Sequence, residues 1–198
     1  MALEPQRRRL TRAEQVEETR QRLIDAGRDV FLRVGFHGAS LDKVANVAGY
    51  TKGAVYSRFE DKDDLFLAVL EQSAEQRIAE LETLMASGSD DLAATLIRSW
   101  EQMVRSEANW FLLVVEFRIH VARNPALAPR YRARHQQLIK AVAAAIARLE
   151  PSVPEPRALA EFVLALASGL AVMGGSHEKL DPTFVREALH TLLRGSAQ

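Results

Sequence analysis

The chain has 198 residues, of which 47% are apolar and 26% charged, with 26 basic and 26 acidic side chains. This composition is typical of a globular protein and excludes a disordered or fibrous chain. The length exceeds the common domain size of about 100 to 150 residues, so a small domain fused to a larger one is as reasonable as one compact core. The chain has no cysteine, which excludes disulfides, thiolate metal sites and thiol catalysis.

The first twelve residues are polar and rich in arginine, and no apolar stretch follows them. We therefore expect no secretory signal. The longest uncharged run, residues 162–177, has 16 residues, fewer than the roughly 20 that span a bilayer. The sequence predicts a cytoplasmic protein without a membrane partner.

Helix formers dominate the sequence: it holds 30 alanines and 25 leucines, against 17 glycines and prolines together. Apolar residues recur at spacings of three and four from Leu23 onward, and no alternating run indicates a strand. The predicted fold class is all-α, with about nine helices.

Short helices are expected near the N-terminus, because four of the ten glycines fall within residues 35–53. A first helix over residues 12–34 would end at Gly35. A second would follow the capping residue Ser40 and stop at Gly49, and Thr51 would cap a third. The first helix is predicted to bury one apolar face, formed by Leu23, Ala26, Val30, Phe31 and Val34.

A long helix is predicted from Asp61 to Ser87, with a middle, residues 71–77, that is polar all round. Such a polar middle is typical of a helix that bridges two cores. We expect a flexible basic arm over residues 1–11, a domain of short helices over 12–60, this connecting helix over 61–87, and a larger helical domain over 88–198. Further helices are expected at residues 90–105, 107–124, 126–149, 155–176 and 182–194.

The second and third predicted helices, joined by a turn at Gly49, have helix-turn-helix form. Lys52 and Arg58 can meet phosphate or guanine, Tyr56 can donate its hydroxyl to a phosphate, and Gly53 allows close backbone approach. The alternative from spacing alone is an ordinary three-helix core with a polar outer face.

Residues 23–66 resemble the DNA-binding domain of the tetracycline-repressor (TetR) family along their whole length. The resemblance includes the Val30 and Phe31 pair, Ser40 at the start of the second helix and the Ala48 and Gly49 turn. It continues at the family spacing through Thr51, Gly53, Tyr56, Phe59 and Lys62. Beyond Phe66 only length and helix count are similar.

This resemblance implies contacts with double-stranded DNA. Phosphate contacts are implied for Ser40, Thr51, Tyr56 and Lys62, and groove contacts for Lys52 and Gly53. Two positions depart from the family pattern: Tyr50 replaces a small aliphatic residue and Arg58 replaces histidine. Tyr50 is expected to be either a DNA contact or a lid on the turn, whereas the permanent charge of Arg58 favours a phosphate contact.

Charge is distributed unevenly along a chain whose formal net charge is zero. Residues 1–62 carry 12 basic and 9 acidic side chains, and the remainder carries 14 and 17. The excess of positive charge lies in the part that would meet DNA. Arg7, Arg8, Arg9 and Arg12 form either an arm toward the flanking DNA or a solvated disordered tail.

The larger domain of such a regulator needs a cavity for an effector, which we expect to be a largely apolar or aromatic small molecule. Most bulky residues at helical spacing are core. Glu107 and Glu116, close to aromatic residues, could suit a cationic ligand but are also explained as solvated. The pocket candidates are Trp100, Met103, Trp110, Phe111, Phe117, Phe162, Met173 and His120, the last expected to be an interior or rim histidine.

The last two predicted helices suit a partner surface, because one is uncharged with small residues and the other is amphipathic. The family resemblance implies a two-fold homodimer through a four-helix bundle, and intramolecular burial is the alternative. The dimer candidates are Leu166, Gly169, Leu170, Val185, Leu189 and Leu192.

An enzyme is not expected. The five histidines show no pair at metal-binding spacing, and neither a phosphate-binding glycine loop nor a nucleophile elbow occurs. No cofactor and no metal are expected. The sequence predicts a ligand-responsive homodimeric repressor of a partly palindromic operator; the alternative is a helical small-molecule carrier that no longer binds DNA.

Overall fold

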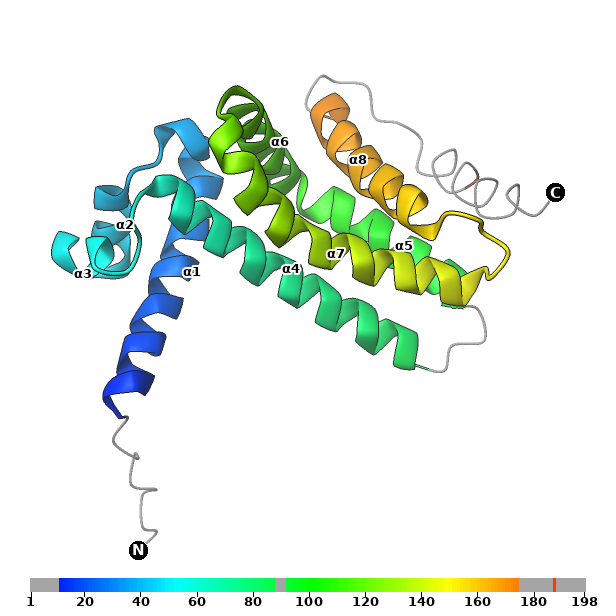
Figure 1. The fold of residues 1–198 in the computed structure, drawn as a ribbon, viewed down its shortest axis with the longest axis horizontal. Coiled ribbons are helices and arrows are strands. Elements are labelled where there is room, and N and C mark those ends of the chain that lie inside the picture. Colours follow the sequence, from blue (N-terminus) through cyan, green and yellow to red (C-terminus); the bar gives the residue numbers. More distant parts are fainter. Residues whose placement is uncertain (1–10, 88–91, 175–186, 188–198) are drawn as a thin grey trace, which may run out of the picture. The chain divides into compact units, whose positions relative to one another are not determined.

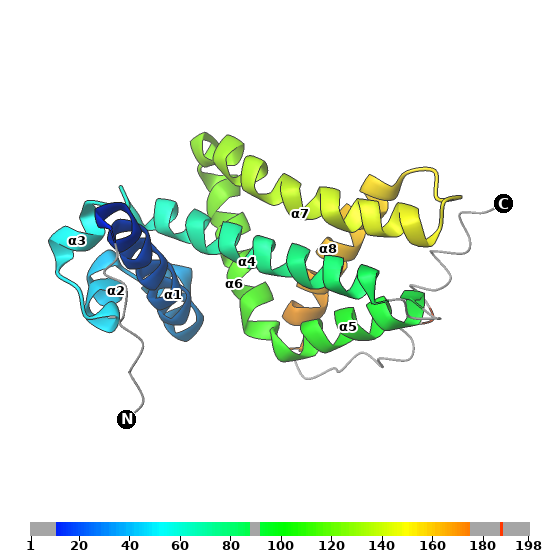
Figure 2. The ribbon, with the colours of Figure 1, turned by 90° about the horizontal axis from the view of Figure 1, so that it is seen from below.

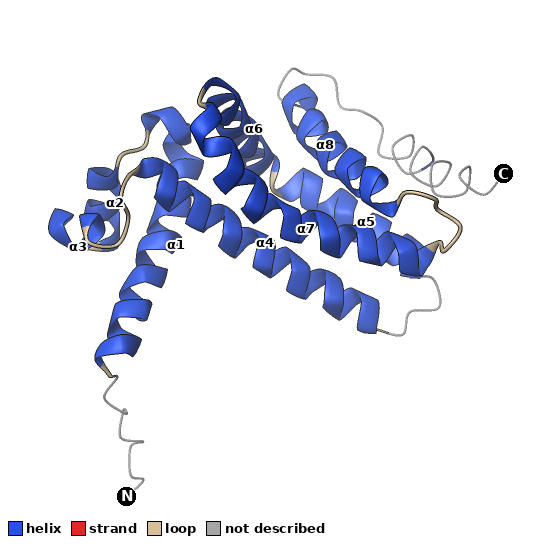
Figure 3. Ribbon diagram, viewed as in Figure 1, coloured by secondary structure: helices blue, strands red, loops and turns tan. Residues whose placement is uncertain are grey.

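The structure of the protein, a computed structural model, describes residues 11–87, 92–174 and 187. Within these ranges it consists of eight α-helices and one short 3-10 helix, without a strand (Figure 3). The all-α fold class is confirmed. The expected helix over residues 182–194 lies outside the described residues, apart from position 187. The chain divides into two units, residues 1–69 and 70–198, and the division falls within the fourth helix.

The first unit contains three complete helices and the start of a fourth (Figure 1). Their bounds are α1 (Arg12–Gly38), α2 (Leu41–Ala48), α3 (Lys52–Tyr56) and α4 (Lys62–Ala86). A capping box fixes the start of α1: Thr11 Oγ1 accepts from the Glu14 amide at 3.3 Å, and the Glu14 carboxylate accepts from the Thr11 amide at 2.7 Å.

Three phenylalanine rings form the centre of the first unit. Phe31, Phe36 and Phe66 are each at most 1% exposed, with ring centroids 4.9 to 6.0 Å apart. Val34, which the sequence places on the buried face, is instead 42% exposed. The reason is Gly35, whose left-handed φ of 72° breaks the helical path and turns Phe36 into the core.

In its described residues the second unit comprises the rest of α4 and four further α-helices, of which α8 packs against α6 and α7 (Figures 1 and 2). Prolines open several of these elements, since their fixed φ suits the first turn. The elements are α5 (Leu92–Ser106), α6 (Ala108–Arg123), η1 (Pro125–Leu127), α7 (Ala128–Leu149) and α8 (Pro156–Gly174).

The middle of α4 differs from its prediction. It is not polar and solvated all round, because Ser73 and Ala74 are buried. Glu71 forms an ion pair with Arg134 of α7. The polar residues of this helix therefore bind it to the rest of the second unit.

Candidate functional site

The pair α2 and α3 is defined by its caps and its turn. Ser40 Oγ accepts from the Lys43 amide, and Thr51 Oγ1 accepts from the Ala54 amide, each at 3.3 Å. Between the helices, Gly49 has a left-handed φ of 72°, where a side chain would be strained. Each capping hydroxyl keeps its own hydrogen, so both can still donate to a phosphate.

One face of α3 is buried and the opposite face is open. Val55 and Phe59 are 0% and 2% exposed and anchor this segment in the core of the first unit. Most of the residues expected to contact DNA are exposed, with Tyr56 at 56%. The exposed members are Ser40, Thr51, Lys52, Gly53 and Tyr56, and the half-buried ones are Tyr50, Arg58 and Lys62.

The basic side chains of this face already have partners within the protein. Lys52 Nζ lies 2.5 Å from Asp42 Oδ2, and the hydrogen bond to this carboxylate raises the pKa of Lys52. Arg58 Nη1 donates to the Ala54 carbonyl and to Ser57 Oγ, both at 3.0 Å. Any anion that binds Lys52 must therefore compete with Asp42.

Lys62 and Tyr50 lie at the edges of the same face. The ammonium of Lys62 is 4.4 Å from the centroid of the Phe36 ring, a cation–π contact that holds it at the start of α4. The pKa of Arg22 on α1 is raised, first by Glu18 and then by a hydrogen bond from the guanidinium to the Tyr50 side chain. Tyr50 thus lies against α1, an arrangement that fits the lid on the turn.

The second unit contains a partly open cavity of about 210 Å³ with a mostly apolar lining. Four of the eight expected pocket residues line it: Trp100, Met103, Trp110 and Phe111. Side chains from α4, α7 and α8 complete the wall, among them Leu84, Val142 and Leu159. This combination of apolar walls and few polar groups is typical of a small-molecule site.

The other four expected pocket residues lie elsewhere. Phe117 is fully buried among side chains, and His120 sits beside it with ring centroids 5.9 Å apart. Phe162 and Met173 are 48% and 46% exposed on α8. Helical spacing alone could not separate these three environments, because core, cavity and surface residues on amphipathic helices share one period.

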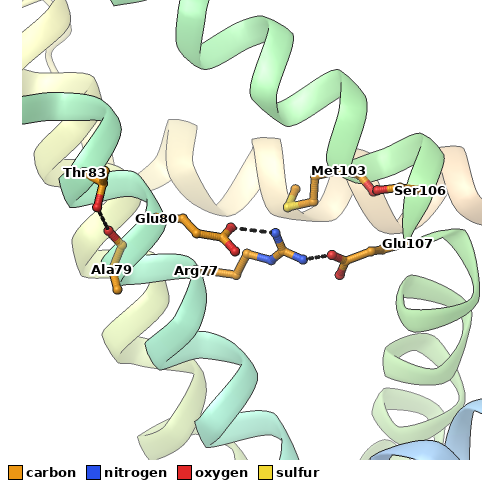
Figure 4. Close-up of polar contacts among 7 residues, drawn as sticks. All are labelled: Arg77, Ala79, Glu80, Thr83, Met103, Ser106 and Glu107. Carbon is orange, nitrogen blue, oxygen red and sulfur yellow. Dashed lines mark hydrogen bonds and ion pairs between the residues drawn. The ribbon is translucent and has the colours of Figure 1, made fainter. Parts of the chain in front are cut away.

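An ion-pair cluster forms the polar part of the large cavity. Figure 4 shows Arg77 reaching from α4 between Glu80 and Glu107. Its guanidinium donates to Glu80 at 2.8 Å and forms an ion pair with Glu107. Because Glu107 is matched by an arginine, its charge is not free for a cationic ligand. Within the described part of the chain, no three histidine or carboxylate residues could hold a metal ion.

A second cavity, of about 60 Å³, was not anticipated from the sequence. Its wall includes Ser73 of α4, Arg118 of α6, and Tyr131 and His135 of α7. Arg118 donates to the Tyr131 hydroxyl at 2.6 Å and bonds His135 Nε2 at 2.9 Å. The signal in the sequence was weak: Tyr131 and His135 are one helical turn apart, but nothing local connects them with Arg118 or Ser73.

The outer face of α8 is apolar and exposed. Phe162, Val172 and Met173 are 46% to 48% exposed, and a side chain added at Gly169 would meet nothing within 4 Å. Leu166 and Leu170 are half-buried. The remaining dimer candidates, Val185, Leu189 and Leu192, lie outside the described residues.

By length and composition alone, residues 156–173 of α8 could also cross a membrane, with a mean hydropathy of 1.5 and 22% of the window buried. The core helix of a soluble protein passes the same test. This 18-residue window includes the charged residues Arg157 and Glu161, which lie outside the uncharged run of residues 162–177.

Comparison with known families matches both units. The family of bacterial regulatory proteins, tetR family, matches residues 23–69. The C-terminal domain of BetI-type transcriptional repressors matches residues 90–197, more than half of the chain.

Two curated relatives from Pseudomonas putida match over 92 residues. The HTH-type transcriptional regulator SrpR is 41% identical, over 46% of this chain and 39% of its own length. The HTH-type transcriptional regulator TtgW is 40% identical, over 46% of this chain and 62% of its own length. The chain therefore aligns with less than two thirds of either relative.

Solved structures are similar over nearly the whole chain. GusR of Salmonella enterica is 22% identical with a TM-score of 0.70, over 94% of this chain and all of that one. The multidrug binding protein EbrR, in complex with proflavin, is 26% identical with a TM-score of 0.62, over 88% and 99% of the two chains.

Proposed function

Because the chain belongs to the tetR family of bacterial regulatory proteins, we propose that it is a ligand-responsive DNA-binding regulator. It acts as a homodimer and represses transcription by occupying a partly palindromic operator in the bacterial cytoplasm. The observation that carries this proposal is the exposed N-terminal half of α3, held from behind by the buried Val55 and Phe59.

In this proposal, α3 enters the major groove. Lys52 leaves Asp42 for a phosphate or base, and Gly53 lets the helix approach the DNA closely. Ser40, Thr51, Tyr56 and Lys62 bind phosphates on either side, since each carries a donor on the exposed or half-exposed surface. Arg58 is tied to its own helix by two hydrogen bonds, which makes it a support for α3 or a secondary phosphate contact.

The second copy is proposed to cover the exposed face of α8. A two-fold dimer is the simplest way to bury Phe162, Val172 and Met173, and Gly169 would let two helices approach closely. Two recognition helices about 34 to 36 Å apart could then enter successive major grooves.

The effector is proposed to bind in the cavity of the second unit. Residues 61–87, most of them in α4, are proposed as the connecting element, because α4 contributes Lys62 to the DNA-reading face and Arg77 to the cavity wall. A ligand can release DNA only if it binds the DNA-competent and released arrangements with different affinity.

The decisive experiment is a fluorescence anisotropy titration with a duplex from the region upstream of the gene, and with a scrambled duplex. We expect the upstream duplex to bind at least tenfold more tightly, and Lys52→Ala to remove most of that preference. Arg33→Ala, which removes an exposed cation of α1, is the matched control and should change affinity less than about threefold. Equal, weak binding of both duplexes by the native protein would instead favour a carrier without DNA function.

A further inference from the structure

The two cavities of the second unit adjoin each other. They share five lining residues, among them Trp110, Phe111 and Leu138. Apolar side chains dominate both linings. The larger cavity has Arg77, Glu80 and Ser99 as its polar residues, whereas the smaller one has three arginines, a tyrosine, a histidine and two serines. A ligand that is apolar along its body and polar at one end fits both cavities, with its polar end beside Arg118.

Three arginines line these cavities, and their charges are matched differently. Arg77 pairs with Glu107 and Glu80, and Arg134 pairs with Glu71. Arg118 is part-buried, and among the described residues it has no carboxylate partner. An incompletely solvated charge without a counterion is costly, so Arg118 is the cation with the most to gain from an anion.

The partners that Arg118 does have are neutral. Guanidinium can only donate, so His135 accepts at Nε2 and keeps its own proton on Nδ1. Burial, and after it the charge of Arg118, lowers the pKa of His135 to about 4. At neutral pH Arg118, Tyr131 and His135 therefore carry one net positive charge together, and Glu161 of α8 is the carboxylate that acts on His135.

A further donor lies unused in the same cavity. Ser73 is 9% exposed, and its hydroxyl has no hydrogen-bond partner among the described atoms. By contrast, Ser168 Oγ, in the same wall, donates to the Leu164 carbonyl at 3.2 Å. A buried hydroxyl without a protein partner is uncommon, and that of Ser73 is available to donate to a polar ligand atom.

We propose that the effector is an amphipathic acid, whose carboxylate is bound in the small cavity by Arg118 and Ser73 and whose apolar body fills the large cavity. This inference rests on the proposed ligand-responsive function and names the ligand class for that site. It keeps the largely apolar effector expected from the sequence and adds an acidic end; the ion pair of Glu107 with Arg77 speaks against a cationic ligand at Glu107.

The size of the large cavity limits the apolar body. Its volume of about 210 Å³ exceeds the roughly 150 Å³ of an engineered cavity that binds benzene. A medium-length alkyl chain or one to two aromatic rings would fill it. The acid is therefore distinguished by its charge and moderate size rather than by a particular skeleton.

The test uses three probes with the same ten-carbon body: decanoate, decanol and decyltrimethylammonium, all below micelle-forming concentrations. The only two tryptophans of the chain, Trp100 and Trp110, both line the large cavity, so quenching of their fluorescence reports occupancy. With the full-length native protein we expect decanoate to bind at least tenfold more tightly than decanol, and the ammonium to bind most weakly. A tighter fit for the ammonium than for decanoate would overturn the proposal.

Variants then locate the carboxylate. Arg118→Gln should weaken decanoate binding by about tenfold to a hundredfold and leave decanol nearly unchanged, while Arg118→Lys restores part of the difference. Ser73→Ala should weaken decanoate by about threefold to tenfold. Arg123→Gln removes an exposed cation of the same helix and is the matched control. If Arg118→Gln and Ser73→Ala both bind decanoate as tightly as the native protein, the carboxylate site is refuted. If neither variant folds, the order of affinities of the native protein for decanoate, decanol and decyltrimethylammonium tests the proposal.

DNA release separates this inference from the proposed function. If decanoate quenches tryptophan fluorescence through Arg118 but leaves duplex binding unchanged, the acid site stands and the ligand-responsive function fails. If a different ligand releases DNA while decanoate never binds, the function stands and the acid site fails.

Discussion

The two units are both helical, but they differ in how completely their interiors are filled. In the first unit Phe31, Phe36 and Phe66 interlock with almost no exposure. The second unit keeps two cavities and leaves one apolar helix face uncovered. A DNA-binding unit can be stabilised by a fully packed core, whereas a ligand-binding unit must keep cavities and apolar surface that other molecules fill.

Truncating one phenylalanine in each unit tests the difference in packing most directly and should have the largest effect. Phe36→Ala should cost about 3 to 5 kcal/mol of unfolding free energy, because it opens a new hole in a filled core. Phe111→Ala, in the wall of both cavities, should cost about 1 to 3 kcal/mol, since its removal extends a space that already exists. Urea denaturation followed by circular dichroism measures both, and equal costs would contradict the difference in packing.

A substitution on the exposed apolar face of α8 should have the next largest effect, on dimer formation and on operator binding. A Cβ added at Gly169 meets nothing within 4 Å among the described residues, so Gly169→Trp should leave the fold intact but prevent a second copy from docking. Sedimentation velocity should show monomers, and operator binding should fall at least a hundredfold because two half-sites are no longer linked. Ala147→Trp, on an exposed position of α7, is the control and should remain dimeric; a dimer in both variants places the interface elsewhere.

Acid should weaken the second unit through His135. Arg118 of α6 and Glu161 of α8 act on its charge, and Tyr131 stacks on its ring at 5.5 Å. Its pKa falls from 6.5 to about 4 on folding, so the unfolded chain takes up a proton near pH 6.5 and the folded chain does not. Stability is therefore lost as the pH decreases from 7 to 5.

Discounted for solvent screening at this half-buried site, the loss from His135 should be about 1 kcal/mol. His135→Gln should make stability less dependent on pH over this range, and His37→Gln, which removes an exposed histidine, should not. Thermal unfolding at pH 7 and pH 5 measures the difference; the same acid loss in His135→Gln as in the native protein would show that another group is responsible.

Within the first unit, Lys62 tests the proposed phosphate contact. Lys62→Ala should weaken all duplexes about fivefold and reduce the salt dependence of binding, because a phosphate contact carries no base information. Anisotropy titrations at several salt concentrations provide both quantities. Selective loss for a single operator sequence would speak against the phosphate role.

Replacing Asp42 should have the smallest effect on DNA affinity, and it should raise the affinity rather than lower it. Asp42 holds Lys52 at 2.5 Å on the exposed face, so Asp42→Asn should free the lysine and tighten DNA binding by about threefold. The same titration measures it, with Asp29→Asn on α1 as a charge-matched control. Weaker binding in Asp42→Asn would mean that the ion pair positions Lys52 for DNA.

The difference between the units also explains what could be predicted from the sequence. In the first unit, the caps Ser40 and Thr51 and the left-handed Gly49 act locally, so their spacing predicted the helices and the turn. Val34 was misplaced because a single left-handed residue, Gly35, redirects the chain. Local signals are sufficient where local geometry decides the structure.

Within residues 92–174 of the second unit the helices were predicted within a few residues, but only four of the eight expected pocket residues line the large cavity. Phe162 and Trp100 have the same apolar character, yet one lies on the surface and the other lines a cavity. Arg118 and Ser73 meet only through the packing of α4 with α6 and α7. Long-range packing, which no local pattern encodes, decides these positions.

The uncovered face of α8 has a consequence for the amount of protein that a cell must hold. If a second copy covers Phe162, Val172 and Met173, folding and association are linked equilibria, and stability rises with the concentration of the chain. Dilution then lowers the melting temperature as well as operator occupancy. A regulator built in this way sets a minimum copy number below which it loses both its partner and part of its resistance to unfolding.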